Sequence, residues 1–218
     1  MTTTTGRDER VSSGAAVAIA LLASGYVAVQ ILSDISSVRL VDVFGKALDG
    51  GTFIYPITFT LRDLIHKVAG KRVARAVIVS AAAVNLFMAG LFWVLARMPG
   101  VVDGGTASET FGTVLAPVWR IVLASILAEL LSETIDTEVY SAWVHRFGET
   151  TQWGRVLVSN GVALPIDSVV FATIAFAGVV PSGVVWEIIW LNIAFKGVVT
   201  IASIPLIYTV RPRAVVAG

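Results

Sequence analysis

The chain has 218 residues, of which 56% are hydrophobic and only 14% are charged. Soluble domains usually carry about 25% charged residues, so this composition indicates a protein that is embedded in lipid. The formal net charge of +1 provides no basic surface for nucleic acid, and the absence of cysteine excludes disulfides, thiolate metal sites and thiol nucleophiles.

Six apolar stretches approach the roughly 20 helical residues that cross a bilayer core about 30 Å thick. In chain order they cover residues 13–32, 52–69, 73–97, 115–140, 156–178 and 184–208. The second stretch is the weakest, because Arg62 and Asp63 lie in its middle. The sequence therefore predicts an all-α integral membrane protein. It would form a single bundle of six transmembrane helices over residues 13–210, between a disordered tail of residues 1–12 and a short tail of residues 211–218.

The distribution of Lys and Arg predicts the orientation, because these residues are held on the cytoplasmic side of a membrane. With six crossings, Arg39, Lys46 and Arg97 fall in the connections on one side. The other side receives ten basic residues: Arg7, Arg10, Lys67, Lys71, Arg72, Arg75, Arg146, Arg155, Arg211 and Arg213. Both termini are therefore expected to lie in the cytoplasm. The membrane is expected to be the cell (plasma) membrane.

Eight charged residues lie inside the predicted spans: Arg62, Asp63, Arg120, Glu129, Glu133, Asp136, Asp167 and Lys196. Each would cost roughly 2.5 to 3.5 kcal/mol if it faced lipid at the centre of a helix. They are therefore expected to face one another or a wet cavity. One alternative is that the basic residues only pair with acids to clamp the bundle. However, five acids against three bases leave an excess of negative charge, which a cation, a proton or hydrogen-bond donors on a substrate would balance.

Helical periodicity places the polar residues on inner faces. On the fourth span, one arc of roughly 100° contains Ser125, Glu129, Ser132, Glu133, Asp136 and Tyr140, and the opposite face contains Leu123, Ile126, Leu127, Leu130 and Leu131. On the fifth, Asn160, Asp167 and Phe171 share a face, beside Pro165, which is expected to kink the helix. On the sixth, Asn192 and Lys196 are one turn apart. Phe53 and Phe171 are candidates to stack on a planar ligand, although packing in the core is the commoner role of such rings.

An enzyme is not expected. The sequence has no Gly-x-Ser-x-Gly elbow, no His-Glu-x-x-His pair and no phosphate-binding glycine loop. Its two histidines, His66 and His145, lie near the ends of apolar runs and are too few for an imidazole-rich metal site. Neither a metal nor a cofactor is therefore expected.

Several segments resemble a known family. The stretch Gly51-Thr-Phe-Ile-Tyr-Pro-Ile-Thr-Phe-Thr-Leu-Arg-Asp-Leu, followed by Gly70-Lys-Arg-Val-Ala-Arg75, resembles a motif and basic turn of the queuosine precursor transporter family, also called the vitamin uptake transporter family. The resemblance continues in order through Arg120-Ile-Val-Leu-Ala-Ser125, Ser132-Glu-Thr-Ile-Asp136, Ser159-Asn160, Asp167-Ser168 and Phe195-Lys196. It covers residues 51–208, and the first helix adds little to it.

The resemblance implies a six-helix importer of 7-cyano-7-deazaguanine or its 7-aminomethyl relative, by secondary or facilitative transport with alternating access. A carboxylate accepts the adjacent N–H and NH₂ donors of such a base. The expected acceptors are Glu133 or Asp136, together with Asp167. Asn160 and Asn192 would read the ring carbonyl and nitrogens, and Phe53 or Phe171 would stack on the ring.

Gating, coupling or clamping is expected of four further residues: Asp63, Arg120, Glu129 and Lys196. Glu129 and Pro165 depart from the family's pattern, and the extra acidity at Glu129 leaves open whether the cationic aminomethyl base or another solute is preferred.

Two other functions stay open. The first is a substrate-binding subunit of an energy-coupling-factor transporter, which needs an ATPase module; the small residues Ala16 and Ala20 on the first helix are candidates to dock a partner. The second is a structural or assembly membrane protein. The expected partners are otherwise a purine-like base and membrane lipid, and a homodimer is left open.

Overall fold

The computed structural model describes residues 5–100, 107–147 and 152–209. Within its helices, some side chains are not described. They belong to residues 5–13, 67, 107–109, 133, 136, 137, 140, 141, 144, 147, 152–156 and 203–209. The elements in chain order are α1 (Thr5–Ser36), β1 (Leu40–Val43), β2 (Lys46–Asp49), the 3-10 helix η1 (Gly50–Phe53), α2 (Pro56–Leu95), α3 (Ala107–Leu115), α4 (Val118–Phe147), α5 (Gln152–Phe176) and α6 (Ser182–Thr209).

Five helical segments of the described chain are long and apolar enough to cross a membrane. They are Gly14–Ser36, Val68–Leu95, Thr110–Ser132, Leu157–Phe176 and Ser182–Ala202. These segments correspond to the first, third, fourth, fifth and sixth predicted spans, and they confirm an all-α membrane protein. The second predicted span, residues 52–69, is not among them.

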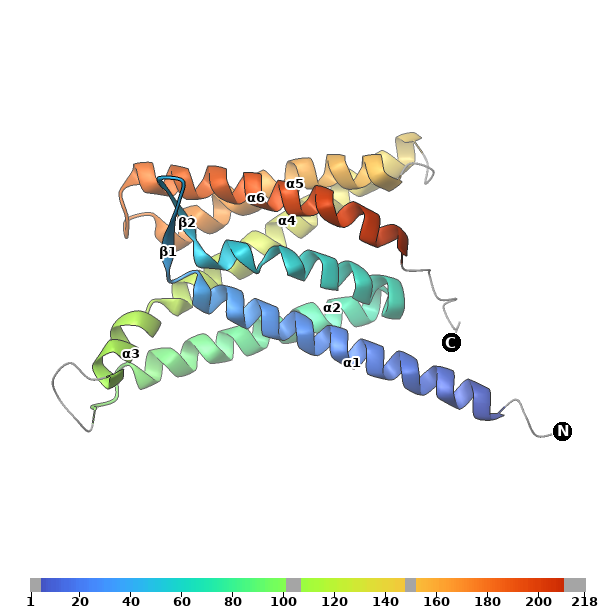
Figure 1. Cartoon of the computed structure of the whole chain (residues 1–218), viewed down its shortest axis with the longest axis horizontal. Helices are drawn as coiled ribbons and strands as arrows, with labels where there is room; N and C mark the ends of the chain where they lie inside the picture. Colours follow the sequence, from blue (N-terminus) through green and yellow to red (C-terminus); the bar gives the residue numbers. More distant parts are fainter. Residues whose placement is uncertain (1–4, 101–106, 148–151, 210–218) are drawn as a thin grey trace.

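The second predicted span forms the first part of α2. The helix is broken at Gly70, whose φ of 82° lies in the left-handed region that favours glycine. The chain reverses within α2, so residues 56–69 and 71–95 run in opposite directions (Figure 1), and Ile65 and Ala74 belong to one apolar cluster. At about 1.5 Å per residue, residues 56–69 extend roughly 20 Å, which is less than the thickness of a bilayer core. Among the described residues there are thus five segments that could span a membrane, and the second predicted span is a shorter helix; the count of six transmembrane helices stays a prediction.

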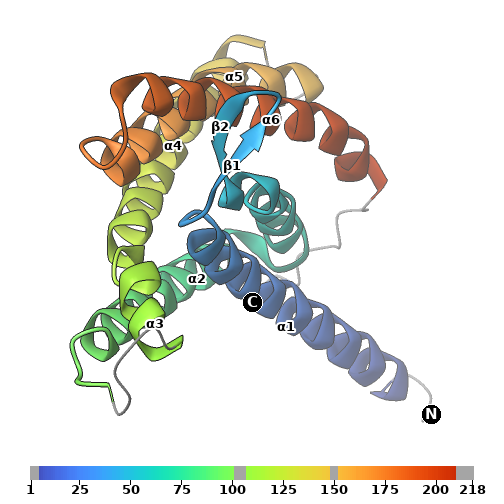
Figure 2. The same ribbon diagram turned by 60° about the vertical axis from the view of Figure 1, so that its left-hand side comes forward.

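A small hairpin between α1 and α2 is an element that the sequence analysis does not predict. Its strands β1 and β2 are antiparallel, with Leu40 opposite Asp49. The turn residues Phe44 and Gly45 both have positive φ, as a tight hairpin turn requires. The backbone N–H of Ala47 donates to Glu187 Oε2 over 3.0 Å, which holds β2 against the first turns of α6 (Figure 2). The hairpin thereby places Asp49, the last residue of β2, next to α6.

The two ends of the bundle differ. The first residues of α1 and the last residues of α6 lie at the end opposite the hairpin (Figure 1). The side of the membrane on which this end lies stays a prediction. The helix α1 begins at Thr5, and the disorder expected of residues 1–12 stays a prediction. Residues 211–218 lie outside the described chain.

The helix α4 has the two faces that its periodicity predicts. Ser125 and Ser132 are buried. Four leucines of the opposite face are exposed on the protein, namely Leu123, Leu127, Leu130 and Leu131. Such an apolar surface is unfavourable in water and suits lipid. Inside, Ala124 and Ala128 of α4 and Ala172 and Ala175 of α5 are buried together, and these small residues allow the two helices to approach closely.

Candidate functional site

Among the described residues, two neighbouring cavities contain predicted site residues. The first, here the hairpin-side cavity, contains about 290 Å³ of space between protein atoms, part of which is open to solvent. Its lining comes from α1, η1, α4, α5, α6 and the segments that join them: Ser33, Asp34, Ser37, Asp49, Gly51, Thr52, Tyr55, Ser125, Ala128, Asp167, Phe171, Asn192 and Lys196. The second, here the Asn160 cavity, contains about 270 Å³. It is lined by Phe59, Arg62, Ser132, Asn160, Ala163, Leu164 and Asp167. Asp167 therefore borders both cavities.

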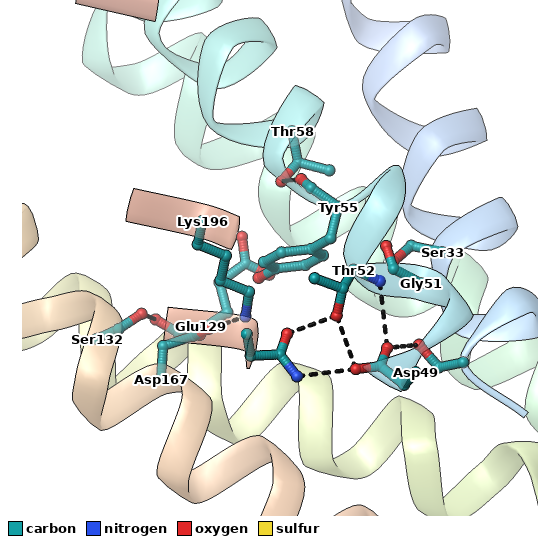
Figure 3. Close-up of polar contacts among 12 residues, drawn as sticks. Ser33, Asp49, Gly51, Thr52, Tyr55, Thr58, Glu129, Ser132, Asp167 and Lys196 are labelled. Atoms are coloured by element: carbon teal, nitrogen blue, oxygen red, sulfur yellow. Dashed lines mark hydrogen bonds and ion pairs between the residues drawn. The ribbon is translucent and has the colours of Figure 1, made fainter. Parts of the chain in front are cut away.

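A buried ion pair lies at this boundary. The ammonium of Lys196 is 2.6 Å from Oδ2 of Asp167, and both side chains are buried (Figure 3). The same ammonium lies 4.8 Å from the ring centroid of Tyr55 and 5.8 Å from that of Phe171. The other carboxylate oxygen, Asp167 Oδ1, has no hydrogen-bond partner in the described protein. The pair thus leaves one acceptor for a further donor.

Tyr55 keeps its hydroxyl proton in this environment. It lies outside the five apolar spans, just before α2. Burial raises the pKa of its phenol well above the ordinary value, and the charges of Asp167 and Glu129 act in the same direction. Tyr55 is therefore a neutral group whose ring faces the Lys196 ammonium (Figure 3).

A hydrogen-bonded network around Asp49 joins α1, η1 and α6 (Figure 3). Asp49 Oδ1 accepts from Ser37 Oγ over 2.8 Å and from the backbone N–H of Thr52 over 3.2 Å. Asp49 Oδ2 accepts from Asn192 Nδ2 over 2.8 Å and from Thr52 Oγ1 over 2.7 Å. The Thr52 hydroxyl also lies 2.6 Å from Asn192 Oδ1. Both oxygens of Asp49 are therefore occupied, and this carboxyl group holds elements together.

The close contact between η1 and α1 depends on Gly51. Its carbonyl accepts a hydrogen bond of 3.2 Å from Ser33 Oγ. A Cβ atom at this position would lie only 2.0 Å from Ser37 Oγ and 2.5 Å from the carbonyl oxygen of Ser33. Only glycine fits this approach, which brings Thr52 into the network.

The helix α1 contributes a polar face that the sequence analysis does not identify. Tyr26, Gln30, Ser33, Asp34 and Ser37 are all buried, and their spacing places them on one side of a helix. The signal is present in the sequence as polar residues at helical spacing within an apolar span. The family resemblance begins at Gly51 and so does not point to this face.

Glu129, which departs from the family's pattern, is held by this face. Its Oε1 accepts from the Tyr26 hydroxyl over 2.6 Å, and its Oε2 accepts from Gln30 Nε2 over 3.2 Å. Gln30 Nε2 also donates to the Tyr26 oxygen over 3.1 Å. Helical periodicity places the Glu129 carboxylate on the inner face of α4. The polar groups of α1 donate the hydrogen bonds that this partly buried carboxylate needs.

Several of the predicted site residues come together. Asp167, Phe171, Asn192 and Lys196 line the hairpin-side cavity. Asn160 lines the other cavity, again with Asp167. Asn192 is engaged at both ends of its amide by Thr52 and Asp49, so its position is fixed by the network.

Other predicted site residues lie elsewhere. Phe53 borders neither cavity and packs edge-on against Phe195, with ring centroids 5.3 Å apart. Asp63 is exposed on the surface of the protein. Arg120 donates through Nε to the carbonyl of Ile174 over 2.6 Å and through Nη2 to that of Ala177 over 2.5 Å. It therefore caps the C-terminal end of α5, where carbonyl groups lack helical partners.

Two further predicted residues are not placed at atomic detail. Glu133 and Asp136 belong to the helix α4, but their side chains lie outside the described part of the structure. Within the described residues, no group of three or more His, Cys, Asp or Glu side chains is arranged to hold a metal ion.

Comparisons with known proteins agree with the resemblance seen in the sequence. Residues 49–210 match the family model described as "Putative vitamin uptake transporter". The chain is also 27% identical over 187 residues to the "Probable queuosine precursor transporter" of Bacillus subtilis (strain 168), a match that covers 83% of this chain and 79% of the relative. No solved structure matches the chain. The family match begins at Asp49, so it includes most of the cavity lining but leaves out α1.

Proposed function

The chain belongs to the vitamin uptake transporter family, whose model it matches over residues 49–210, and from this premise we propose that it imports a deazaguanine precursor of queuosine. The family and the name of the relative describe a membrane uptake transporter, and not an enzyme. The proposed substrates are 7-cyano-7-deazaguanine and 7-aminomethyl-7-deazaguanine. The proposed membrane is the plasma membrane, with both termini in the cytoplasm.

The unpartnered oxygen of Asp167 supports a guanine-like substrate. A carboxylate in a buried site binds adjacent N–H and NH₂ donors strongly, and it rejects a ligand that leaves it unpaired. Asp167 Oδ1 is such an acceptor, and the Phe171 ring in the same cavity provides an apolar surface for a flat heterocycle. In this proposal Asp167 binds the donor edge of the base and Phe171 contacts its ring.

Alternating access is supported by the position of Asp167 between the two cavities. The hairpin-side cavity is bordered by Asp49, the last residue of β2, and by Thr52 of η1. The Asn160 cavity is bordered by Arg62 and Ser132 instead. We propose that substrate bound at Asp167 competes with Lys196 for this carboxylate and passes from one cavity to the other. Transporter sites commonly lie between two such halves.

Coupling to protons is a separate part of the proposal. One of two acids of α4, Glu133 or Asp136, would take up a proton during import, because their helix has an excess of negative charge. Uptake that is unchanged when the pH gradient is collapsed would contradict this part and leave facilitative transport.

A second candidate function is the substrate-binding subunit of an energy-coupling-factor transporter. The observation that favours it is that Ala16 and Ala20 of α1 are exposed, on a helix that extends away from the bundle (Figures 1 and 2). Such a helix is available to a partner with an ATPase module, or to lipid.

Uptake by the purified protein in liposomes tests both candidates. Radiolabelled 7-cyano-7-deazaguanine and 7-aminomethyl-7-deazaguanine are added outside, and empty liposomes give the background. Accumulation of either base without a partner protein supports the transporter. Binding of a base without accumulation favours the subunit of a larger complex, and neither binding nor accumulation contradicts the proposed substrate.

A further inference from the structure

Asp34 is a buried carboxyl group that neither the family match nor the predicted site includes. It lies near the end of α1, before the matched residues 49–210. Only 2% of its surface is exposed, and it lines the hairpin-side cavity. Its oxygen Oδ2 has no hydrogen-bond partner in the described protein. A buried acceptor without a partner is costly to maintain, so its retention calls for an explanation.

The neighbours of Asp34 on the same helix face are all engaged within the chain. Ser33 Oγ donates to the Gly51 carbonyl, and Ser37 Oγ donates to Asp49. Gln30 donates to Glu129. Asp34 interacts with the side chain of Ser125, which leaves its Oδ2 directed at no protein donor. Asp34 Oδ2 is thus a hydrogen-bond acceptor on the polar face of α1 that the described protein leaves without a donor.

The charges around the hairpin-side cavity are not balanced by its own residues. Its lining contains the carboxyl groups of Asp34, Asp49 and Asp167 and the ammonium of Lys196. Lys196 is paired with Asp167. Asp49 has both oxygens occupied by hydrogen-bond donors. A positive group on the ligand would balance the charge at Asp34.

We propose that Asp34 binds a cationic substituent of the transported base, so that the protein prefers 7-aminomethyl-7-deazaguanine to 7-cyano-7-deazaguanine. Asp34 Oδ2 and Asp167 Oδ1 are unpartnered acceptors in one cavity. The aminomethyl base carries donors at its guanine edge and an ammonium on its five-membered ring. The cyano base has the same guanine edge but places a neutral acceptor at the second position. A charge-assisted hydrogen bond to Asp34 is therefore open to the first base alone.

This inference rests on the proposed function, and a binding measurement with both bases separates the two. The full chain in detergent is titrated with each base. The unchanged protein is expected to bind the aminomethyl base at least about tenfold more tightly, as one charge-assisted hydrogen bond allows. Equal affinity, or tighter binding of the cyano base, would overturn the inference and leave the proposed function intact. Binding of neither base would overturn both.

The variant Asp34→Asn tests the residue itself. It keeps the shape of the side chain and removes its charge, so it is expected to weaken binding of the aminomethyl base about tenfold and to change binding of the cyano base little. Asp34→Ser is the second variant if the first does not fold. Asp42→Asn is the matched control, because Asp42 is exposed on the hairpin and borders neither cavity. An equal loss of affinity for both bases would assign Asp34 a structural role and overturn the inference.

Discussion

The ammonium of Lys196 lies 2.6 Å from Oδ2 of Asp167, with only 4% and 2% of the two side chains exposed. Both charged side chains are therefore almost entirely buried by the protein. Such a pair adds little net stability compared with apolar residues, but removal of one partner leaves an uncompensated buried charge. A substitution that changes the charge at either residue is therefore expected to change the stability of the bundle as well.

Lys196→Met is expected to lower the free energy of unfolding by about 3–5 kcal/mol, because it leaves the Asp167 carboxylate buried alone. Thermal unfolding in detergent measures the effect. Addition of Asp167→Asn is expected to restore part of the loss, since no unpaired charge then remains. Lys46→Met is the control: its ion pair with Glu187 is 3.7 Å long and its side chain is 59% exposed, so about 1 kcal/mol or less is expected. Equal effects of the two lysine substitutions would contradict a buried ion pair between Lys196 and Asp167.

Phe171→Leu is expected to weaken binding of a deazaguanine base about tenfold, because it removes the aromatic face and keeps most of the apolar volume. Phe53→Leu is the matched control, since Phe53 borders neither cavity. It is expected to leave affinity unchanged. Titration calorimetry of the two variants shows which phenylalanine contacts the base. A loss of affinity confined to the Phe53 variant would contradict binding of the base at Phe171.

Gly51→Ala is expected to unfold at a lower temperature and to lose binding, because its Cβ would meet Ser37 Oγ at 2.0 Å and a backbone oxygen at 2.5 Å. The 3-10 helix must then move away from α1 and open the Asp49 network. Gly90→Ala is the control, because nothing lies within 4 Å of its added Cβ. That change is expected to be neutral, or stabilising by up to about 1 kcal/mol through helix propensity. Thermal unfolding of both variants checks the contrast; equal stability of the two would argue against the tight approach of η1.

Arg120→Met is expected to lower stability by about 1.5–3 kcal/mol, because it removes two charged hydrogen bonds to the carbonyls at the end of α5. The affinity for a deazaguanine base should change by less than about twofold, because Arg120 borders neither cavity. Unfolding temperature and ligand affinity are measured on the same preparation. A normal unfolding temperature with lost affinity would assign Arg120 to binding or gating and contradict its role as a cap.

Part of the candidate site follows from local sequence. The spacing of Asn192 and Lys196 places them one turn apart on α6, and both border the hairpin-side cavity. Asp167 and Phe171 share a face of α5 in the same way and reach the same cavity. Helical periodicity is a local property, so these groupings are readable without knowledge of the fold.

Other parts depend on contacts between residues far apart in the chain. Asp49 meets Asn192 because the hairpin brings it to α6, and the hairpin itself is absent from the sequence prediction. Phe53 and Phe171 have similar aromatic side chains, yet only Phe171 borders a cavity. The role of Arg120 as a cap is also invisible in its own segment, because its partners lie 54 and 57 residues away.

The sequence by itself determined that this is a membrane protein and which faces of its helices are apolar. These properties follow from the energy of placing each residue in lipid or water, which depends on the residue and its helical spacing. The tertiary structure alone decided that Lys196 is paired with Asp167, that α1 supplies Asp34, and that Asp49 is occupied. Hydrogen bonds and ion pairs act over about 3 Å, so they exist only once packing has chosen which helix faces meet.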